Sequence, residues 1–262
     1  MKKGPEISTF IGLAIGVGAV LGAMHFKHVK LSAFNNPAAL LIILAGTVAC
    51  IVIAFPGSQL KEVGKLFKIV FTKTAIPKHE DTINMIVEAA KKARQDGFVA
   101  MEGYIGGIEN PFFAKGLQML VDGIAQDEIV EIMENEISAL EERHATGASV
   151  FAQACAYAPT LGVLGAVFGL IAAMSFLDDT EEMSHAIAAA FMATILGIFT
   201  GYVVWGPFAN KLKVKSKEEV AVMNMVLVGV VQIQKGVNPM TIRDALIAMI
   251  PTKMQKKLMD KR

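Results

Sequence analysis

The chain has 262 residues, 53% of them hydrophobic, with a mean hydropathy of +0.49 and a formal net charge of +1. This composition is too apolar for an ordinary soluble protein. Charged segments interrupt it too often for a bundle that is buried in lipid throughout. It therefore predicts a membrane protein with a substantial aqueous portion.

Four uncharged runs are long enough to cross a bilayer, which takes about 20 apolar residues in a helix. The first is too long for a signal-peptide core and no Ala-x-Ala-like site closes it, so we expect it to be retained. The predicted fold is an all-α integral membrane protein, with four transmembrane helices forming two hairpins and a helical cytoplasmic insert between the second and third. The runs are residues 7–24, 37–55, 151–176 and 186–208.

The charges around these runs predict their orientation. Residues 56–78 carry five Lys and one Glu, residues 209–262 carry eleven Lys or Arg and four acids, and the loop 177–184 carries acids and no base. Short Lys-rich segments stay in the cytoplasm, so we expect both termini and the insert to be cytoplasmic. The predicted parts are a hairpin (1–55), a cytoplasmic helical domain (56–150), a second hairpin (151–208) and a basic tail (209–262).

An amphipathic helix is predicted directly after the second run, in SQLKEVGKLFKIVF. Lys61, Lys65 and Lys68 lie away from its apolar stripe, a pattern typical of a helix resting on the anionic inner leaflet. The stripe consists of Leu60, Val63, Phe67, Val70 and Phe71.

The insert predicts further helices. One covers residues 79–96 and stops at Gly97, and another starts where Asn110 precedes Pro111. A third begins near Asp127. No Pro follows it before residue 157, so it is predicted to continue into the third span, with Gly147 as the only expected break.

Polar residues inside the third and fourth runs predict a lining rather than a plain anchor. Pro159 removes a backbone donor, and the Thr160 hydroxyl needs a partner within the membrane. Thr194 lies in the middle of the fourth run. A lone Thr there commonly donates to the carbonyl one turn back, but pairing with Thr160 and Tyr157 would instead form a polar track.

Glycines at small-xxx-small spacing predict close helix packing, within one copy or between copies. These are Gly12, Gly16, Gly18 and Gly22 in the first run, Gly162, Gly165 and Gly169 in the third, and Gly197 and Gly201 in the fourth.

None of the four runs contains Asp, Glu, Lys, Arg or His, although proton relays need a titratable group in the membrane. Either no proton is conducted or a partner supplies the carboxylate. His25 and His28 are interpreted as loop residues rather than metal ligands. Nucleophile motifs and phosphate-binding loops are missing from the sequence, so we expect neither an enzyme nor a cofactor.

A mixed-charge segment, KKARQDGFVAME, combines Lys91, Lys92 and Arg94 with Glu102 beyond a glycine turn. The simplest interpretation is a solvated face. Its position in the cytoplasmic insert favours contact with a complementary partner surface.

Four segments, in the order of two hairpins around an insert, resemble a known family. They are NPAALLIILAGT, ARQDGFVAMEGYI, YAPTLGVLGAVFGLI and ATILGIFTGYVVWGPFANKLK. Together they resemble the MotA/PomA family of flagellar stator subunits over nearly the whole chain, and more distantly the ExbB and TolQ subunits of envelope energisers.

The resemblance implies that Arg94 and Glu102 engage the rotor protein FliG. It also implies that Pro159 and Pro207 take part in torque generation and that Thr194 lies on the ion path. Together with Tyr157 and Thr160 from the polar track and with Ala166, the predicted set for the ion path and its coupling is Tyr157, Pro159, Thr160, Ala166, Thr194 and Pro207.

The same resemblance implies the partners. A one-span MotB protein would supply the membrane Asp, inside a pentameric ring of this chain in the bacterial inner membrane. No nucleic acid is expected.

Sodium-driven relatives carry Thr where this chain has Ala166, and a hard cation needs oxygen ligands. Proton drive is therefore favoured. The alternatives are a sodium-driven stator and an ExbB/TolQ-like transducer of envelope transport.

Overall fold

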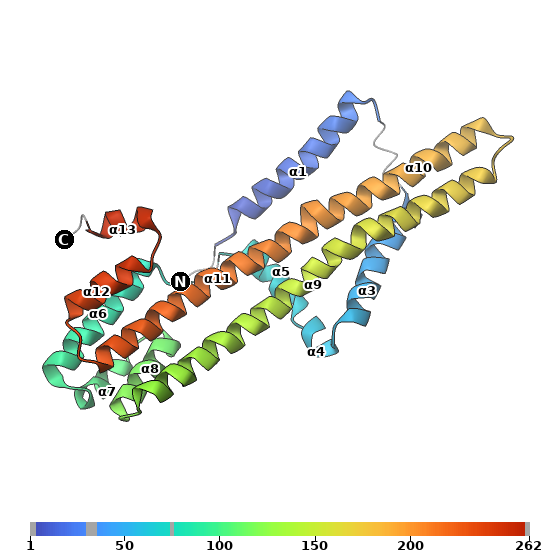
Figure 1. The fold of residues 1–262 in the computed structure, drawn as a ribbon. Helices are drawn as coiled ribbons and strands as arrows, with labels where there is room; N and C mark the ends of the chain where they lie inside the picture. The colour runs from blue at the N-terminus through green and yellow to red at the C-terminus, as the bar shows by residue number, and fades with distance from the viewer. Residues whose placement is uncertain (1–3, 30–35, 74–75, 260–262) are drawn as a thin grey trace. The chain divides into compact units, whose positions relative to one another are not determined.

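The computed structural model describes residues 4–29, 36–73 and 76–259. Within these ranges the regular structure is helical, apart from one isolated antiparallel bridge between Pro5 and Thr72 (Figure 1). This confirms the all-α prediction. The chain divides into two units. The first consists of Met1–Thr74 and His144–Val214, and the second of Ala75–Arg143 and Lys215–Arg262.

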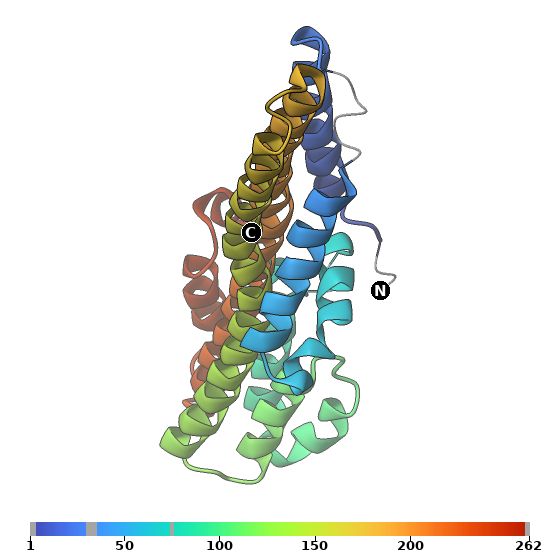
Figure 2. The same ribbon diagram turned by 90° about the vertical axis from the view of Figure 1, so that its right-hand side faces the viewer.

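Four helices of the described chain are long and apolar enough to cross a membrane, and they coincide with the four predicted runs. Two of them, α9 (Gln126–Met174) and α10 (Thr180–Phe199), run side by side in both views (Figure 1 and Figure 2). The first span is α1 (Ile7–Phe26). The second consists of α2 (Pro37–Leu40), η2 (Leu41–Ala45) and α3 (Gly46–Ala54); the fourth continues from α10 through η4 (Thr200–Trp205) into α11 (Gly206–Gln234).

The third span belongs to one uninterrupted helix, as the lack of Pro between Asp127 and Tyr157 predicts. The expected break at Gly147 is wrong, because α9 continues through it. A Cβ built at Gly147 would lie 3.0 Å from Cδ2 of Leu66, on α5 (Val63–Phe71). The glycine therefore makes room for a neighbouring side chain instead of ending a helix.

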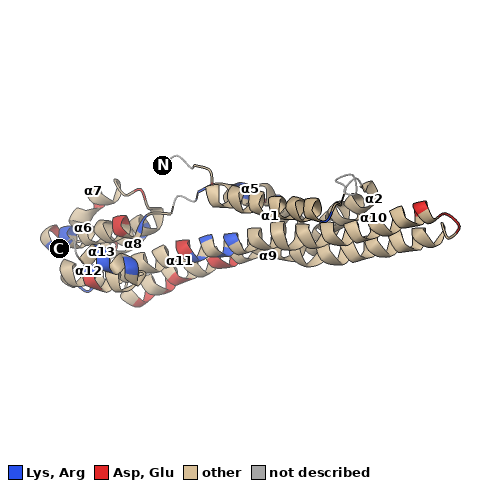
Figure 3. Ribbon diagram, turned by 90° about the horizontal axis from the view of Figure 1, so that it is seen from above, with Lys and Arg blue, Asp and Glu red and all other residues tan. Residues whose placement is uncertain are grey.

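The acidic loop between the third and fourth spans is shorter than predicted, since α10 already begins at Thr180. Asp179 caps it by accepting hydrogen bonds from the backbone N–H groups of Glu181 and Glu182, both at 3.1 Å. The glutamates lie in the first turn, where the helix dipole favours negative charge. Figure 3 shows this end of α10 and the loop in red, beside uncharged lengths of α9 and α10.

The apolar stripe of α5 faces protein, so its predicted placement against lipid is wrong. Val70 has no exposed surface, and Phe67 packs its ring 5.0 Å from that of Phe151 on α9. Phe71 lies 5.3 Å from the ring of Phe208 on α11. The helix is amphipathic because an aromatic cluster of the first unit covers one of its faces. A short helix, α4 (Gly57–Leu60), connects it to α3.

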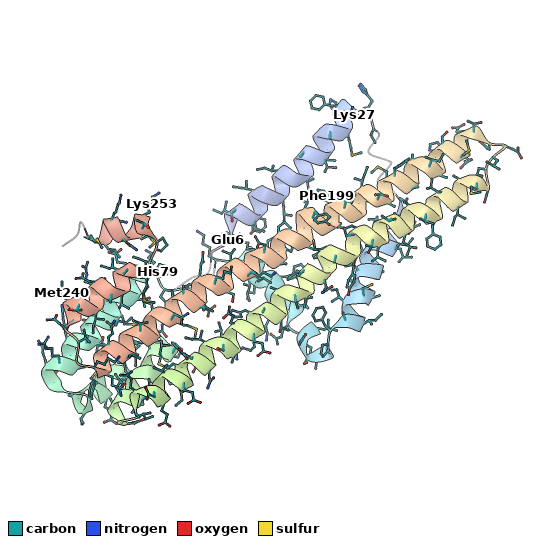
Figure 4. The ribbon with its side chains drawn as sticks, viewed as in Figure 1. Glu6, Lys27, His79, Phe199, Met240 and Lys253 are labelled. Carbon is teal, nitrogen blue, oxygen red and sulfur yellow. The ribbon has the colours of Figure 1, made fainter. Side chains whose placement is uncertain are left out.

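The start of α1 is tied to two other elements of the first unit. The Lys211 ammonium on α11 donates to the hydroxyls of Ser8 (2.8 Å) and Thr9 (2.7 Å) and lies 3.6 Å from the Glu6 carboxylate. The Glu6 N–H donates to Phe71 O at 2.9 Å. Figure 4 labels Glu6 at this end of α1 and Lys27 at the other. Since α1 buries little of its own surface, these contacts dominate its attachment.

Replacing Lys211 by Met is therefore expected to destabilise the first unit by about 1–3 kcal/mol, because the partly buried Glu6 carboxylate and the two hydroxyls lose their shared donor. Thermal unfolding followed by the fluorescence of Trp205, the chain's single Trp, reports this unit. Lys213→Met is the matched control, because Lys213 lies on the same helix and is exposed. Equal shifts for both variants would contradict the assignment.

The second unit is built from short helices around one apolar core. Local capping signals set their bounds as predicted. α6 (His79–Asp96) ends at Gly97, which has a φ of +76°, and α8 (Pro111–Val121) begins after Asn110. Asn110 Oδ1 accepts from the N–H groups of Phe112 and Phe113 at 3.0 and 3.1 Å. Both features satisfy helix ends that would otherwise lack partners.

The core of the second unit also takes in the last part of the chain. After α11, the chain forms α12 (Pro239–Ala248) and α13 (Thr252–Met259), so the described tail is helical on both sides of Pro251. Ile242, Leu246 and Leu258 are buried in the same apolar core as residues of α6 and α8. The basic tail is therefore part of a packed unit that it forms with the insert.

Candidate functional site at the third and fourth spans

Glycines bring α9 and α10 into backbone contact, as their spacing predicts. A Cβ built at Gly197 would lie 2.7 Å from Ala158 O and 2.8 Å from Gly162 Cα. A Cβ at Gly169 would meet Cβ of Ala190 at 2.8 Å. Real Cβ atoms do not approach other atoms this closely, so only glycine fits. Along the seam between α9 and α10, the two helix backbones are therefore in direct contact.

The glycines of the first span behave differently. Among the described residues, nothing lies within 4 Å of a Cβ built at Gly12, Gly18 or Gly22. Gly16 alone of the four makes a close approach, 2.6 Å from Cγ1 of Val203 in η4. Within one copy, the predicted packing of α1 through its glycines is therefore limited to Gly16.

The predicted site residues of α9 fall on two faces. Pro159 and Ala166 are half-buried and seven residues apart, which at about 100° per residue places them on one side of the helix. Thr160 is exposed. It is two residues from both Ala158 and Gly162 in the seam, or about 200° around the helix from each, so it points away from α10. The structure does not place Thr160 beside Thr194.

The hydroxyls of the spans also separate into two groups. Thr160 donates to Tyr157 O at 2.7 Å, Thr200 to Leu196 O at 2.8 Å, and Thr47 to Ile43 O at 2.5 Å. The Thr194 hydroxyl makes no such bond to any residue that the structure describes, although its side chain is half-buried. The simple interpretation of back-bonding therefore fits Thr47, Thr160 and Thr200 and not Thr194. This leaves Thr194 with a free polar group next to Ala193 in the seam.

Pro159 of α9 and Pro207 of α11 are connected by η4, a segment that the sequence did not predict. η4 is a π-helix that ends immediately before Gly206 and Pro207. Pro207 cannot donate to the carbonyl one turn back, so the wider i→i−5 pattern satisfies the turn before it: the Gly206 N–H donates to Gly201 O. The Pro159 ring packs on Gly201. The only feature of the sequence that could have indicated a π-helix here was the position of Pro207.

A second set of predicted residues lies in the second unit, around the turn after α6. Arg94 is in the last turn of α6, and Glu102 starts α7 (Glu102–Ile105); both are exposed. Neither makes an ion pair with another described residue. Val99 between them is 79% exposed, on the short helix η3 (Val99–Met101), while Met101 is fully buried and anchors the turn. Both charges are available to an external surface.

Tyr104, in α7, helps to hold the same turn in place. Its ring lies 5.2 Å from the Lys92 ammonium, a cation–π contact. Burial raises the pKa of the Tyr104 phenol, and the Glu88 carboxylate raises it further. The phenol therefore stays neutral at physiological pH, so it adds no negative charge between Arg94 and Glu102.

Comparison with known proteins gives two family models that overlap and together cover most of the chain. The MotA/TolQ/ExbB proton channel family matches residues 105–225, and the motility protein A N-terminal family matches residues 10–112. Motility protein A of Bacillus subtilis is 47% identical, across 94% of this chain and 91% of the relative. Chemotaxis protein PomA of Vibrio alginolyticus is 32% identical, across 90% and 92%.

Solved structures agree. The flagellar MotAB stator complex from Bacillus subtilis matches with a TM-score of 0.89 at 47% identity, across 95% of this chain and 98% of the solved chain. MotAB from C. jejuni also gives 0.89, at 30% identity, across 94% and 96%.

The fold and the site define a multi-span membrane protein in which two closely packed helices carry proline and an unpaired hydroxyl but no charge in their membrane-spanning runs. The chain belongs to the MotA/TolQ/ExbB proton channel family. Its function is that of the family's motility proteins, a stator subunit of the bacterial flagellar motor.

Proposed function

We propose that this chain forms one half of a proton path and that a one-span MotB-type partner supplies the titrating Asp. The observation that carries the proposal is the uncharged seam between α9 and α10. It offers the Thr194 hydroxyl and a proline-disturbed helix, but the four uncharged runs contain no group that can take up a proton. A proton relay needs such a group. The two similar solved structures are the MotAB stator complex of Bacillus subtilis and MotAB of C. jejuni, which supports a partner of this kind.

The topology proposed with this function has both termini, residues 56–150 and the tail on the cytoplasmic side. Contacts within the first unit support it, because the residues before α1, the end of α5 and Lys211 after the fourth span meet at one end of the spans. A chain with four spans brings both of its ends to the same side. Lys-rich flanks mark that side as cytoplasmic.

Torque in this proposal is delivered through Arg94 and Glu102, which contact the rotor protein FliG. Their exposure, and the lack of an ion-pair partner for either among the described residues, support the assignment. Several copies of the chain, a pentamer by family resemblance, surround the partner helices. One proton crossing 100 mV releases about 2.3 kcal/mol, so each step is small and the cycle must repeat.

Proton drive is expected to make swimming independent of sodium. Ala166, which lies on the same side of α9 as Pro159, offers no side-chain oxygen to a dehydrated cation. Swimming speed measured in sodium-free and sodium-containing medium, with the chain and its partner expressed in a stator-deleted host, should therefore differ by less than about twofold.

Ala166→Thr is the complementary test, because it adds a side-chain oxygen at this position. Its control is Ala173→Thr, seven residues further along α9 at a buried position. The Ala166 variant alone should acquire some dependence on sodium. Loss of swimming without sodium in the unmodified protein would refute proton drive. Failure to restore swimming, with both proteins present in the membrane, would favour an envelope transducer of the ExbB/TolQ kind.

A further inference from the structure

The two prolines of the membrane unit each disturb a helix, and the disturbed turns are in contact. Pro159 has no N–H, so it cannot donate to Cys155 O one turn earlier in α9. Pro207 likewise cannot donate to Val203 O, and the π-helix η4 lies directly before it. A π-helical turn within an α-helix marks a functional position more often than an ordinary turn does.

Gly201, inside η4, is the point of contact. A Cβ built there would lie 2.8 Å from Cγ and 2.9 Å from Cδ of the Pro159 ring, and 3.0 Å from Cys155 O. Gly201 is buried. The ring that distorts α9 is therefore seated on the widened turn of the fourth span, and no side chain separates them.

The nearby glycines make contacts of a different kind from the contact at Gly201. Gly162 and Gly197 of the same seam meet each other's backbone, in regular helix. Gly206, at the other end of η4, meets the end of a side chain, Cys155 Sγ, at 3.1 Å. Gly201 differs because its neighbour is the rigid proline ring, which cannot move without moving α9.

We infer that Gly201 is a positioning residue that transmits a shift of α9 at Pro159 to the helix that carries Pro207. A π-helical turn holds more residues than an α-helical turn, so tightening or relaxing it rotates the helix that follows. Packed elements of this kind switch between discrete arrangements rather than deform gradually. The inference rests on the proposed function, in which the α9–α10 seam forms half of a proton path and the partner supplies the titrating Asp.

The test is a double-mutant cycle on thermal unfolding of the purified complex with its partner. Gly201→Ala should lower the unfolding midpoint by about 4 °C or more, because the new methyl group meets the ring. In the Pro159→Ala background the ring is gone and position 159 regains its N–H. There, only Cys155 O at 3.0 Å remains close to the new methyl group, so the same Gly201 change should cost less than about half as much.

Gly206→Ala is the matched control. It lies five residues away on the same helix and packs on the same turn of α9, but its methyl group would meet only a sulfur atom that can rotate away. It should lower the midpoint by less than about 1 °C in either background. Equal losses for Gly201→Ala with and without the Pro159 ring would overturn the inference.

Torque provides the readout that a purely structural role would not change. At equal stator levels in the membrane, Gly201→Ala should reduce torque on a tethered bead at least about tenfold, and Gly206→Ala should leave it near normal. Normal torque in the Gly201 variant would overturn the inference. If that variant does not assemble, assembly becomes the readout: Pro159→Ala should restore it, and failure of the double variant would also overturn the inference.

Failure of the proposed function would look different. A wild-type complex that depends on sodium, or that does not support swimming, would refute proton drive or the motor role. The unfolding cycle would still report whether Gly201 and Pro159 are coupled.

Discussion

Replacing Gly197 by Val is expected to remove most of the folded protein from the membrane. The Cβ alone would lie 2.7 Å from Ala158 O and 2.8 Å from Gly162 Cα, and both of these atoms belong to helix backbone. Because neither can rotate away, α9 and α10 must separate, at a cost of about 3 kcal/mol or more. The measurement is the amount of full-length protein in the membrane fraction, together with the unfolding midpoint of the purified variant.

Gly18→Val in α1 is the matched control for this change. It introduces the same side chain at a glycine of another span, where nothing described lies within 4 Å of the new Cβ. Near-normal amounts are expected for this variant. If both variants accumulate equally, the α9–α10 seam does not hold the membrane unit together.

Reversing the charge at Arg94 or Glu102 is expected to abolish most swimming while membrane levels and partner binding stay normal. Each side chain is exposed and has no ion-pair partner among the described residues, so reversal removes no internal contact. It does turn an attraction to the rotor surface into a repulsion, which costs several kcal/mol where charges are juxtaposed. Swimming in soft agar and torque on a tethered bead measure the effect.

Lys91→Glu is the control for Arg94→Glu. Lys91 is exposed on the same helix, three residues earlier, and carries the same charge. A small loss is expected there. Normal swimming in both single reversals and in the double reversal would remove these residues from the rotor contact.

Local features of the second unit were predictable because short-range chemistry determines them. The end of α6 at Gly97 and the start of α8 after Asn110 depend on hydrogen bonds between residues a few positions apart. The long helix α9 was predicted for the same reason, from the lack of an interior Pro before the span. The error at Gly147 arose because a glycine that weakens a helix and a glycine that admits Leu66 are identical in sequence.

Features that depend on a second surface were predicted poorly. The apolar stripe of α5 has the same pattern whether lipid or protein covers it, and here the rings of Phe151 and Phe208 do. Small-xxx-small spacing occurs in α1 and in α9, but α1 meets a described partner at Gly16 alone, whereas α9 does so at Gly162, Gly165 and Gly169. The contrast between Thr194 and the other threonines depends likewise on which carbonyl each hydroxyl reaches.

The sequence by itself determined the four spans, the helix ends of the insert and the absence of Asp, Glu, Lys, Arg and His from the uncharged runs. These properties follow from transfer free energies and local hydrogen bonds, which belong to residues close together in the chain. Only the tertiary structure decided which face of each helix is covered, that the Pro159 ring rests on Gly201 in a π-helical turn, and that the tail packs with the insert. Those outcomes require two surfaces, far apart in sequence, to fit each other, and neither surface encodes that fit alone.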